Sequence, residues 1–143
     1  MPCPRSFARP RGAWQSRRVG SYRPDVSPAH NKSESVNDAL DALDRGVEPE
    51  RPVLRDAVRA LLAELARIAP GRSVEVRIPP FGAIQCVPGP RHTRGTPPNV
   101  VETDAMTWLL VATGRLDWPA AVASGKIHAS GIRTDLSEFL PLY

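Results

Sequence analysis

The sequence has few of the residue types that carry catalysis or bind metals. It holds 143 residues but only two cysteines, Cys3 and Cys86, and three scattered histidines, His30, His92 and His128. Two distant cysteines do not form a disulfide framework, and no Cys/His pair has the spacing of metal ligands. No apolar run approaches the roughly 18 residues that cross a bilayer. We expect no metal, no cofactor, no stable membrane insertion and a cytoplasmic location.

Known catalytic motifs are also missing from the sequence. There is no phosphate-binding loop, no dinucleotide-binding glycine pattern and no nucleophile elbow. One enzymatic hypothesis uses Arg91, His92 or Cys86. However, Cys86 lies in an apolar run, where burial raises the pKa of a thiol and makes it unreactive. We therefore expect no catalytic residues and a protein that is not an enzyme.

The positive charge is concentrated at the N-terminus. Residues 1–34 carry seven basic and two acidic groups, whereas residues 35–143 carry 12 basic and 13 acidic groups, a formal charge of −1. The first segment is rich in proline and has no apolar periodicity, so we interpret it as a disordered basic arm or an extension from a misassigned start codon. Because the remaining domain, 35–143, is nearly neutral and has few aromatic residues, we expect no nucleic-acid partner.

Hydrophobic periodicity from Ser35 onward predicts a single small domain. Amphipathic spacing, caps and glycine stops predict helices, and alternation between proline- and glycine-rich turns predicts short strands. The expected helices are 35–46, 50–71, 104–113 and 118–124, with a final capped turn over 134–142, and the expected strands are 73–78, 81–87, 99–103 and 126–130. This order predicts an α+β fold, with a small, mostly antiparallel sheet of four to five strands and helices packed on one face.

The most apolar of these helices raises a functional question. Seven of the eight residues from Ala105 to Ala112 are apolar, so this helix must be covered on more than one side. It is either the central element of a packed core or one wall of a cavity for an apolar ligand. The packed core is the favoured interpretation from the pattern alone, at about two to one.

The segment "WLLVATGRLDWPAAVASGKIHASG", with its apolar helix, Gly114, short Ala-rich helix and strand, resembles the second half of sterol carrier protein type 2 domains. Together with "SVEVRIPPFGAIQCVPGPRHTRGTPPNVVETDAM", it resembles a bacterial branch of that superfamily over about residues 36–142. The resemblance implies a five-stranded sheet, helices on one face and an apolar tunnel between them that holds lipids without a catalytic residue set. By position, it implies a ligand wall formed by Met106, Trp108, Leu109, Leu110, Val111, Trp118, Val122, Phe139 and Leu140.

The basic loop before the third strand adds a possible polar rim. Arg91, His92 and Arg94 together could hold a carboxylate or phosphate, as an anionic lipid head would present. The alternative is a proline-stiffened loop whose arginines pair with Glu102 or Asp104. We thus expect the domain to bind an apolar small molecule or fatty acyl lipid. The alternative function is an accessory or protein-interaction domain with a filled core, and the pattern favours no particular oligomeric state.

Overall fold

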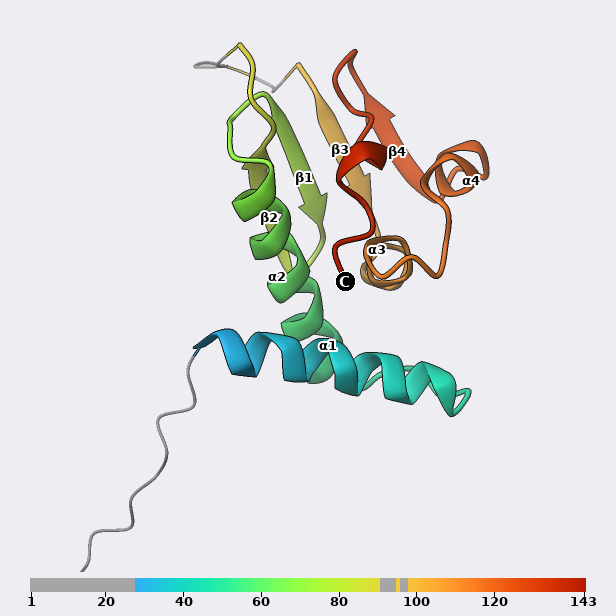
Figure 1. The fold of residues 1–143 in the computed structure, drawn as a ribbon. Helices are drawn as coiled ribbons and strands as arrows, with labels where there is room; N and C mark the ends of the chain where they lie inside the picture. Colours follow the sequence, from blue (N-terminus) through green and yellow to red (C-terminus); the bar gives the residue numbers. More distant parts are fainter. Residues whose placement is uncertain (1–27, 91–94, 96–97) are drawn as a thin grey trace, which may run out of the picture.

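A computed structural model describes residues 28–90, 95 and 98–143, with side chains described from Glu34 onward. Figure 1 shows its arrangement as a sheet with helices in front of it. The elements are α1 (Pro28–Asp44), α2 (Arg51–Ile68), β1 (Val74–Ile78), β2 (Gly82–Cys86), β3 (Val100–Thr103), α3 (Ala105–Ala112), α4 (Trp118–Ala123), β4 (Ile127–Ser130) and the 3-10 turn η1 (Ser137–Phe139). The predicted order of helices and strands is confirmed.

The four strands form one sheet in the order β2-β1-β3-β4. The pairs β1–β2 and β3–β4 are antiparallel, while the central pair β1–β3 is parallel. The predicted α+β fold is therefore confirmed, with four strands and two antiparallel pairings out of three. The parallel pair arises because β3 follows the long connection after β2 and lies beside β1 instead of extending the hairpin.

The two faces of the sheet differ in character. Val74, Val76 and Ile78 of β1 are buried, and their register partners on β2 and β3 face the same way. Glu102 and His128 are register partners on the opposite face, and both are exposed. This alternation has the two-residue period of strands. The helices lie over the apolar face (Figure 1), as the sequence predicts.

Helix α2 contributes seven buried residues to the core, more than any other helix in the described part of the chain. Its sequence predicts one apolar stripe formed by Leu54, Ala57, Val58, Leu61, Leu65 and Ile68. The first five are buried, whereas Ile68 is 38% exposed because it lies at the end of the helix, beyond the packed part. Two further residues, Ala60 and Leu62, are buried as well. They are buried because α2 is covered on two sides, by α1 and by the sheet. A helix between two layers buries a wider face than a surface helix.

Helix α1 begins at Pro28, several residues before the expected start at Ser35. Proline is tolerated in the first turn of a helix because the backbone N–H that it lacks has no partner there. The prolines that favoured an unstructured arm thus do not oppose a helix from this position onward. The rest of the predicted arm, residues 1–27, lies outside the described residues.

The C-terminal segment after β4 returns across the helices. Leu136 is 0% exposed and belongs to the core, and the backbone N–H of Leu142 donates to the Ala112 carbonyl over 2.7 Å. The Tyr143 hydroxyl donates to the side-chain oxygen of Asn37 in α1. Figure 1 shows the segment running between α2 and α3. The chain end therefore closes the seam between these two helices.

This placement predicts a large stability effect at Leu136. Leu136→Ala removes a fully buried side chain and leaves a cavity, so we expect a loss of about 2–5 kcal/mol in the free energy of unfolding. Ile132→Ala is the matched control, because Ile132 is 96% exposed four residues earlier. Its change should stay within about 0.5 kcal/mol. Urea unfolding followed by circular dichroism measures both, and equal losses would contradict the anchoring role of Leu136.

Candidate functional site

Helix α3 is positioned by well-defined ends. Asp104 caps its N-terminus, accepting hydrogen bonds from the Thr107 backbone N–H over 2.8 Å and from the Thr107 hydroxyl over 2.6 Å. Burial acts to raise the pKa of Asp104, but these hydrogen bonds outweigh it and hold the pKa below its usual value. Gly114, with φ 75°, follows the helix in the left-handed conformation that glycine adopts readily. The cap and stop predicted from the sequence thus fix where the apolar helix lies.

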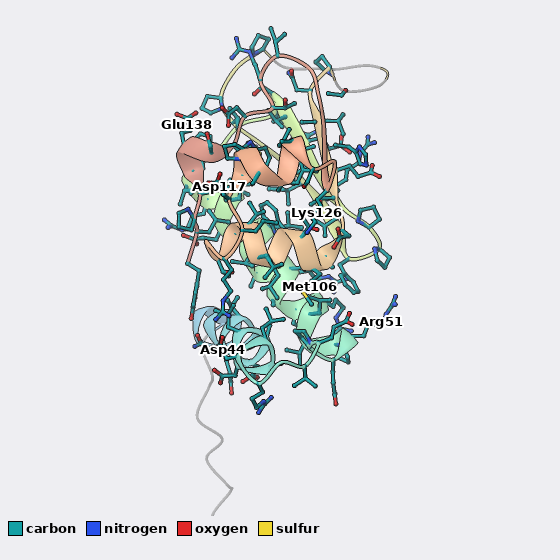
Figure 2. All side chains as sticks on the ribbon, turned by 90° about the vertical axis from the view of Figure 1, so that its right-hand side faces the viewer. Asp44, Arg51, Met106, Asp117, Lys126 and Glu138 are labelled. Atoms are coloured by element: carbon teal, nitrogen blue, oxygen red, sulfur yellow. The ribbon has the colours of Figure 1, made fainter. Side chains whose placement is uncertain are left out.

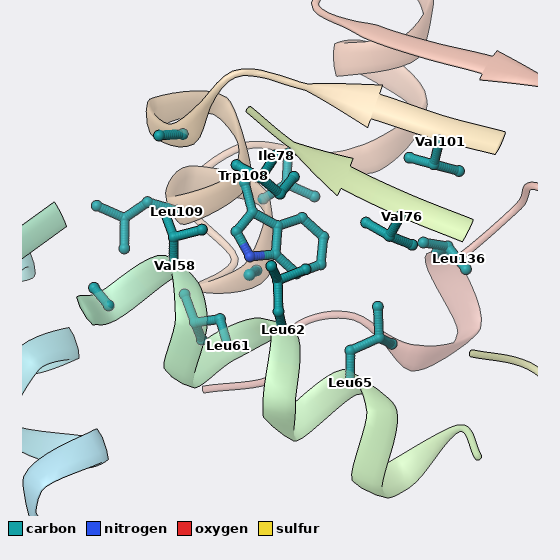
Figure 3. Packing of buried hydrophobic residues seen from close by; sticks show 14 of the residues in the cluster. Val58, Leu61, Leu62, Leu65, Val76, Ile78, Val101, Trp108, Leu109 and Leu136 are labelled. Atoms are coloured by element: carbon teal, nitrogen blue, oxygen red, sulfur yellow. The ribbon is translucent and has the colours of Figure 1, made fainter. Parts of the chain in front are cut away.

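Trp108 lies at the centre of the core. Its side chain is 0% exposed and sits between α2 and the sheet, with Ile78 on one side and Leu62 on the other (Figure 3). Leu109, the next residue, is also 0% exposed. At these two positions of the predicted ligand wall, protein side chains surround the helix closely. This part of α3 therefore fits the packed-core interpretation.

A hollow of about 250 Å³ lies at the C-terminal end of α3. Its apolar lining comes from Val111 at the end of α3, Leu116, Trp118 at the start of α4, and Leu140 and Pro141 in the C-terminal segment. Gly114, Asp117, Pro119 and Ser137 complete the lining. The structure thus brings together Val111, Trp118 and Leu140 from the predicted wall. These residues come from three segments that are far apart in the sequence.

The other residues of the predicted wall do not line this hollow. Met106, Leu110 and Phe139 are half-buried, and Val122 is 36% exposed on α4. Figure 2 shows Met106 on the side of Arg51, away from Asp117, which does line the hollow. The nine residues therefore divide among the hollow, the core and the outer surface.

The predicted polar rim of Arg91, His92 and Arg94 lies outside the described residues. Its described flank, Asn99, comes directly before β3, whereas α3 follows the other end of that strand. The loop therefore joins the sheet at the end away from α3. Neither the anion-binding interpretation nor the pairing with Glu102 or Asp104 is tested by the described residues.

Asn99 is a buried polar residue that the sequence pattern did not single out. Its amide nitrogen donates to the Ser73 carbonyl over 2.9 Å, and its amide oxygen accepts from the Arg133 backbone N–H over 3.1 Å. Asn99 thereby joins the starts of β1 and β3 to the turn after β4. Gly131 in that turn approaches Asn99 so closely that a Cβ there would lie 2.4 Å from the amide oxygen. Asn and Gly are individually typical of turns, so no local pattern indicates that these two residues meet.

Two further hollows have more charged residues in their lining than the hollow at Val111. One, of about 380 Å³ between α1 and the start of α2, is lined by Asp38, Asp41, Glu48 and Glu50 together with Arg45 and apolar residues. The other, of about 390 Å³ at the end of β3, is lined by Glu102, Thr103, Asp104, Lys126 and His128 among others. Within the described ranges, no group of three or more His, Cys, Asp or Glu side chains could hold a metal ion. The hollow at Val111 is therefore the candidate site for an apolar ligand.

Cys86 has the environment expected of a structural thiol. It is a free cysteine, fully buried at the end of β2. Burial raises the pKa of its thiol to about 11. Because the thiolate is the reactive form, this environment opposes a nucleophilic role at neutral pH. The predicted burial of Cys86 is confirmed.

The fold and the hollow define a small α+β domain with a recess of mixed lining, in which Asp117 is the one charged residue, between its helices and its C-terminal segment. The chain belongs to a family described as bacterial SCP ortholog, whose model matches residues 50–142. This match confirms the resemblance to bacterial sterol carrier protein-like domains. None of the curated proteins compared with the chain matches it. No helix in the described part of the chain is long and apolar enough to cross a membrane.

The pKa of Cys86 predicts slow labelling. In a Cys3→Ser background at pH 8, a thiol with a pKa of about 11 holds about a hundredfold less thiolate than one with the ordinary value of 9.0. We expect Ellman's reagent to react with the folded chain at least a hundredfold more slowly than with the urea-unfolded chain. Absorbance at a fixed reagent concentration measures both rates. Rates within tenfold of each other would show that Cys86 is accessible and that its pKa is not raised.

Proposed function

We propose that this domain binds and carries an apolar small molecule, such as a fatty acyl lipid, without catalysing a reaction. The observation that supports it most directly is the hollow at Val111, Trp118 and Leu140. Its apolar residues lie in the segment that matches the family of bacterial SCP orthologs. Hydrophobic contact and shape are sufficient to hold such a ligand, since burial of apolar surface contributes roughly 25 cal/mol per Å².

The size of the hollow bears on the ligand. At about 250 Å³ it lies below the roughly 300–1,000 Å³ that is usual for small-molecule sites. A short chain fits the recess as it stands, whereas a larger ligand requires the C-terminal segment to move outward. Leu140 and Pro141 of that segment form one wall. Displacement of the segment would therefore enlarge the hollow directly.

A second function is favoured by the packing around Trp108. The indole fills the space between α2 and the sheet, where a carrier would hold its ligand. A domain with a filled core would act as an accessory or protein-interaction domain. The two functions differ in one respect: whether the recess at Val111 accepts a ligand in solution.

The first test compares two predicted wall residues with different surroundings. Leu140→Asn places a polar amide in the hollow, and we expect at least a tenfold weaker affinity for a fluorescent fatty acid, because an unpaired buried amide is costly. Val122→Asn is the matched control, since Val122 does not line the hollow and is already partly exposed. Its affinity should change less than twofold. Equal losses in both variants, with unchanged melting temperatures, would place the ligand elsewhere.

The second test separates the carrier from the accessory domain. After mild purification, native mass spectrometry should detect adducts in the mass range of acyl lipids on the intact chain. Organic extraction should remove the adducts, and added decanoic acid should restore a single adduct. A chain that stays free of adducts and binds no fluorescent fatty acid at micromolar concentration would support the accessory function instead.

A further inference from the structure

The indole N–H of Trp108 is a hydrogen-bond donor that has no acceptor among the described residues of the fold. Its Nε1 is the one buried side-chain nitrogen or oxygen in the described part of the chain that has no hydrogen-bond partner. Buried tryptophan N–H groups usually find an acceptor, and an unsatisfied one in a folded protein calls for an explanation. The side chain is 0% exposed, so bulk water does not satisfy the N–H. The core therefore contains a donor without an acceptor.

The side chains that α2 directs toward this donor are apolar. In Figure 3 the nitrogen lies on the side of the indole that faces α2, where Val58, Leu61 and Leu62 project toward it. A buried water needs two to four polar partners. These three side chains supply none. An acceptor that suits this place must arrive on a molecule that is itself apolar.

The chemistry of the acceptor is further limited by charge and by hydrogen-bond capacity. An ionised carboxylate among leucines would lose its hydration without a charged partner. A hydroxyl would bring an O–H donor of its own, which would then lack an acceptor. A carbonyl oxygen only accepts and carries no charge. A ketone or an ester carbonyl therefore matches the indole N–H best.

The donor lies close to the candidate site. Val111, which lines the hollow, is three residues after Trp108, so the two side chains are neighbours on one face of α3, about one turn apart. We propose that Trp108 Nε1 donates a hydrogen bond to the carbonyl oxygen of a neutral apolar ketone or ester whose chain occupies the hollow at Val111. This inference rests on the proposed carrier function and adds the chemical class of the ligand.

The bound state requires the recess to deepen toward the indole. Leu142 and Leu136 anchor the C-terminal segment beside α3 and in the core, as described above. When the seam between α2 and α3 widens, the path from Val111 to the indole opens. A ligand shifts a protein toward an open state only by its stronger binding to that state. The hydrogen bond to Trp108 supplies such a difference, because the closed state leaves the N–H unpaired.

The direct test observes the indole N–H in the unmodified chain. The three tryptophans, Trp14, Trp108 and Trp118, give three indole resonances in a ¹⁵N–¹H correlation spectrum, assigned with single Trp→Phe variants. Saturation with 2-undecanone should shift the Trp108 N–H resonance downfield, as formation of a hydrogen bond does. Saturation with undecane should leave the proton without such a shift. The same response to both ligands would overturn the proposal.

The second test uses matched ligands and matched variants. Trp108→Phe keeps an aromatic ring and removes the donor, so the affinity for 2-undecanone should fall about three- to tenfold more than the affinity for undecane. Trp118→Phe makes the same chemical change at a residue that lines the hollow, and it should affect both ligands alike. Displacement of a fluorescent probe measures the six affinities, two for the unmodified chain and two for each variant.

The outcomes separate the inference from the function on which it rests. A ketone preference that disappears only in Trp108→Phe supports the proposal. Binding of undecane and 2-undecanone with equal losses in Trp108→Phe overturns the role of the indole N–H and leaves the carrier function standing. If the unmodified chain binds neither ligand nor any fluorescent fatty acid, the carrier function and this inference both fail.

Discussion

The indole of Trp108 joins the two layers of the molecule, because α2 packs on one side of the ring and the sheet on the other (Figure 3). An aromatic side chain of this size buries roughly 150–250 Å², which corresponds to about 4–6 kcal/mol of hydrophobic free energy. The same burial leaves Nε1 without an acceptor, at a cost of about 1–3 kcal/mol. The burial of the ring stabilises α3 in its place between α2 and the sheet. The unpaired N–H makes this core less stable than an equally packed core that contains only apolar groups.

The favourable burial of the Trp108 ring and the cost of its unpaired N–H bear on both candidate functions, the carrier and the accessory domain. Under the proposed carrier function, the filled core and the ligand-bound form would be two states of the seam between α2 and α3 that differ in the position of the C-terminal segment. Leu136 gives the closed state a firm anchor in the core, while Leu140 and Pro141 only border the hollow. The segment is thus anchored on both sides of the recess, at Leu136 in the core and at Leu142, whose backbone N–H donates to the Ala112 carbonyl. A local outward movement at Leu140 would expose the hollow without removing Leu136 from the core.

Local patterns in the sequence predicted the elements, because the causes of each are close in the chain. The alternation of Val74, Val76 and Ile78 identifies a half-buried strand, and Asp104 and Gly114 mark the ends of α3. The candidate site could be predicted only in part, since it depends on contacts between distant segments. Val111, Trp118 and Leu140 meet only because the chain end returns over α3. Nothing local to Val122, by contrast, shows that α4 turns it outward.

The segment that matches the family model does not contain the whole core. The match begins at residue 50, after α1, yet Val36 and Ala39 of α1 are buried. Arg115, just after α3, donates two hydrogen bonds to Asp44 at the end of α1, and the guanidinium lowers the pKa of that carboxyl. The pair is exposed, so its contribution to stability is small, but with the Tyr143–Asn37 hydrogen bond it ties α1 to both sides of the seam. Helix α1 is therefore part of the packed domain, and a chain that begins at residue 50 would expose apolar surface of α2.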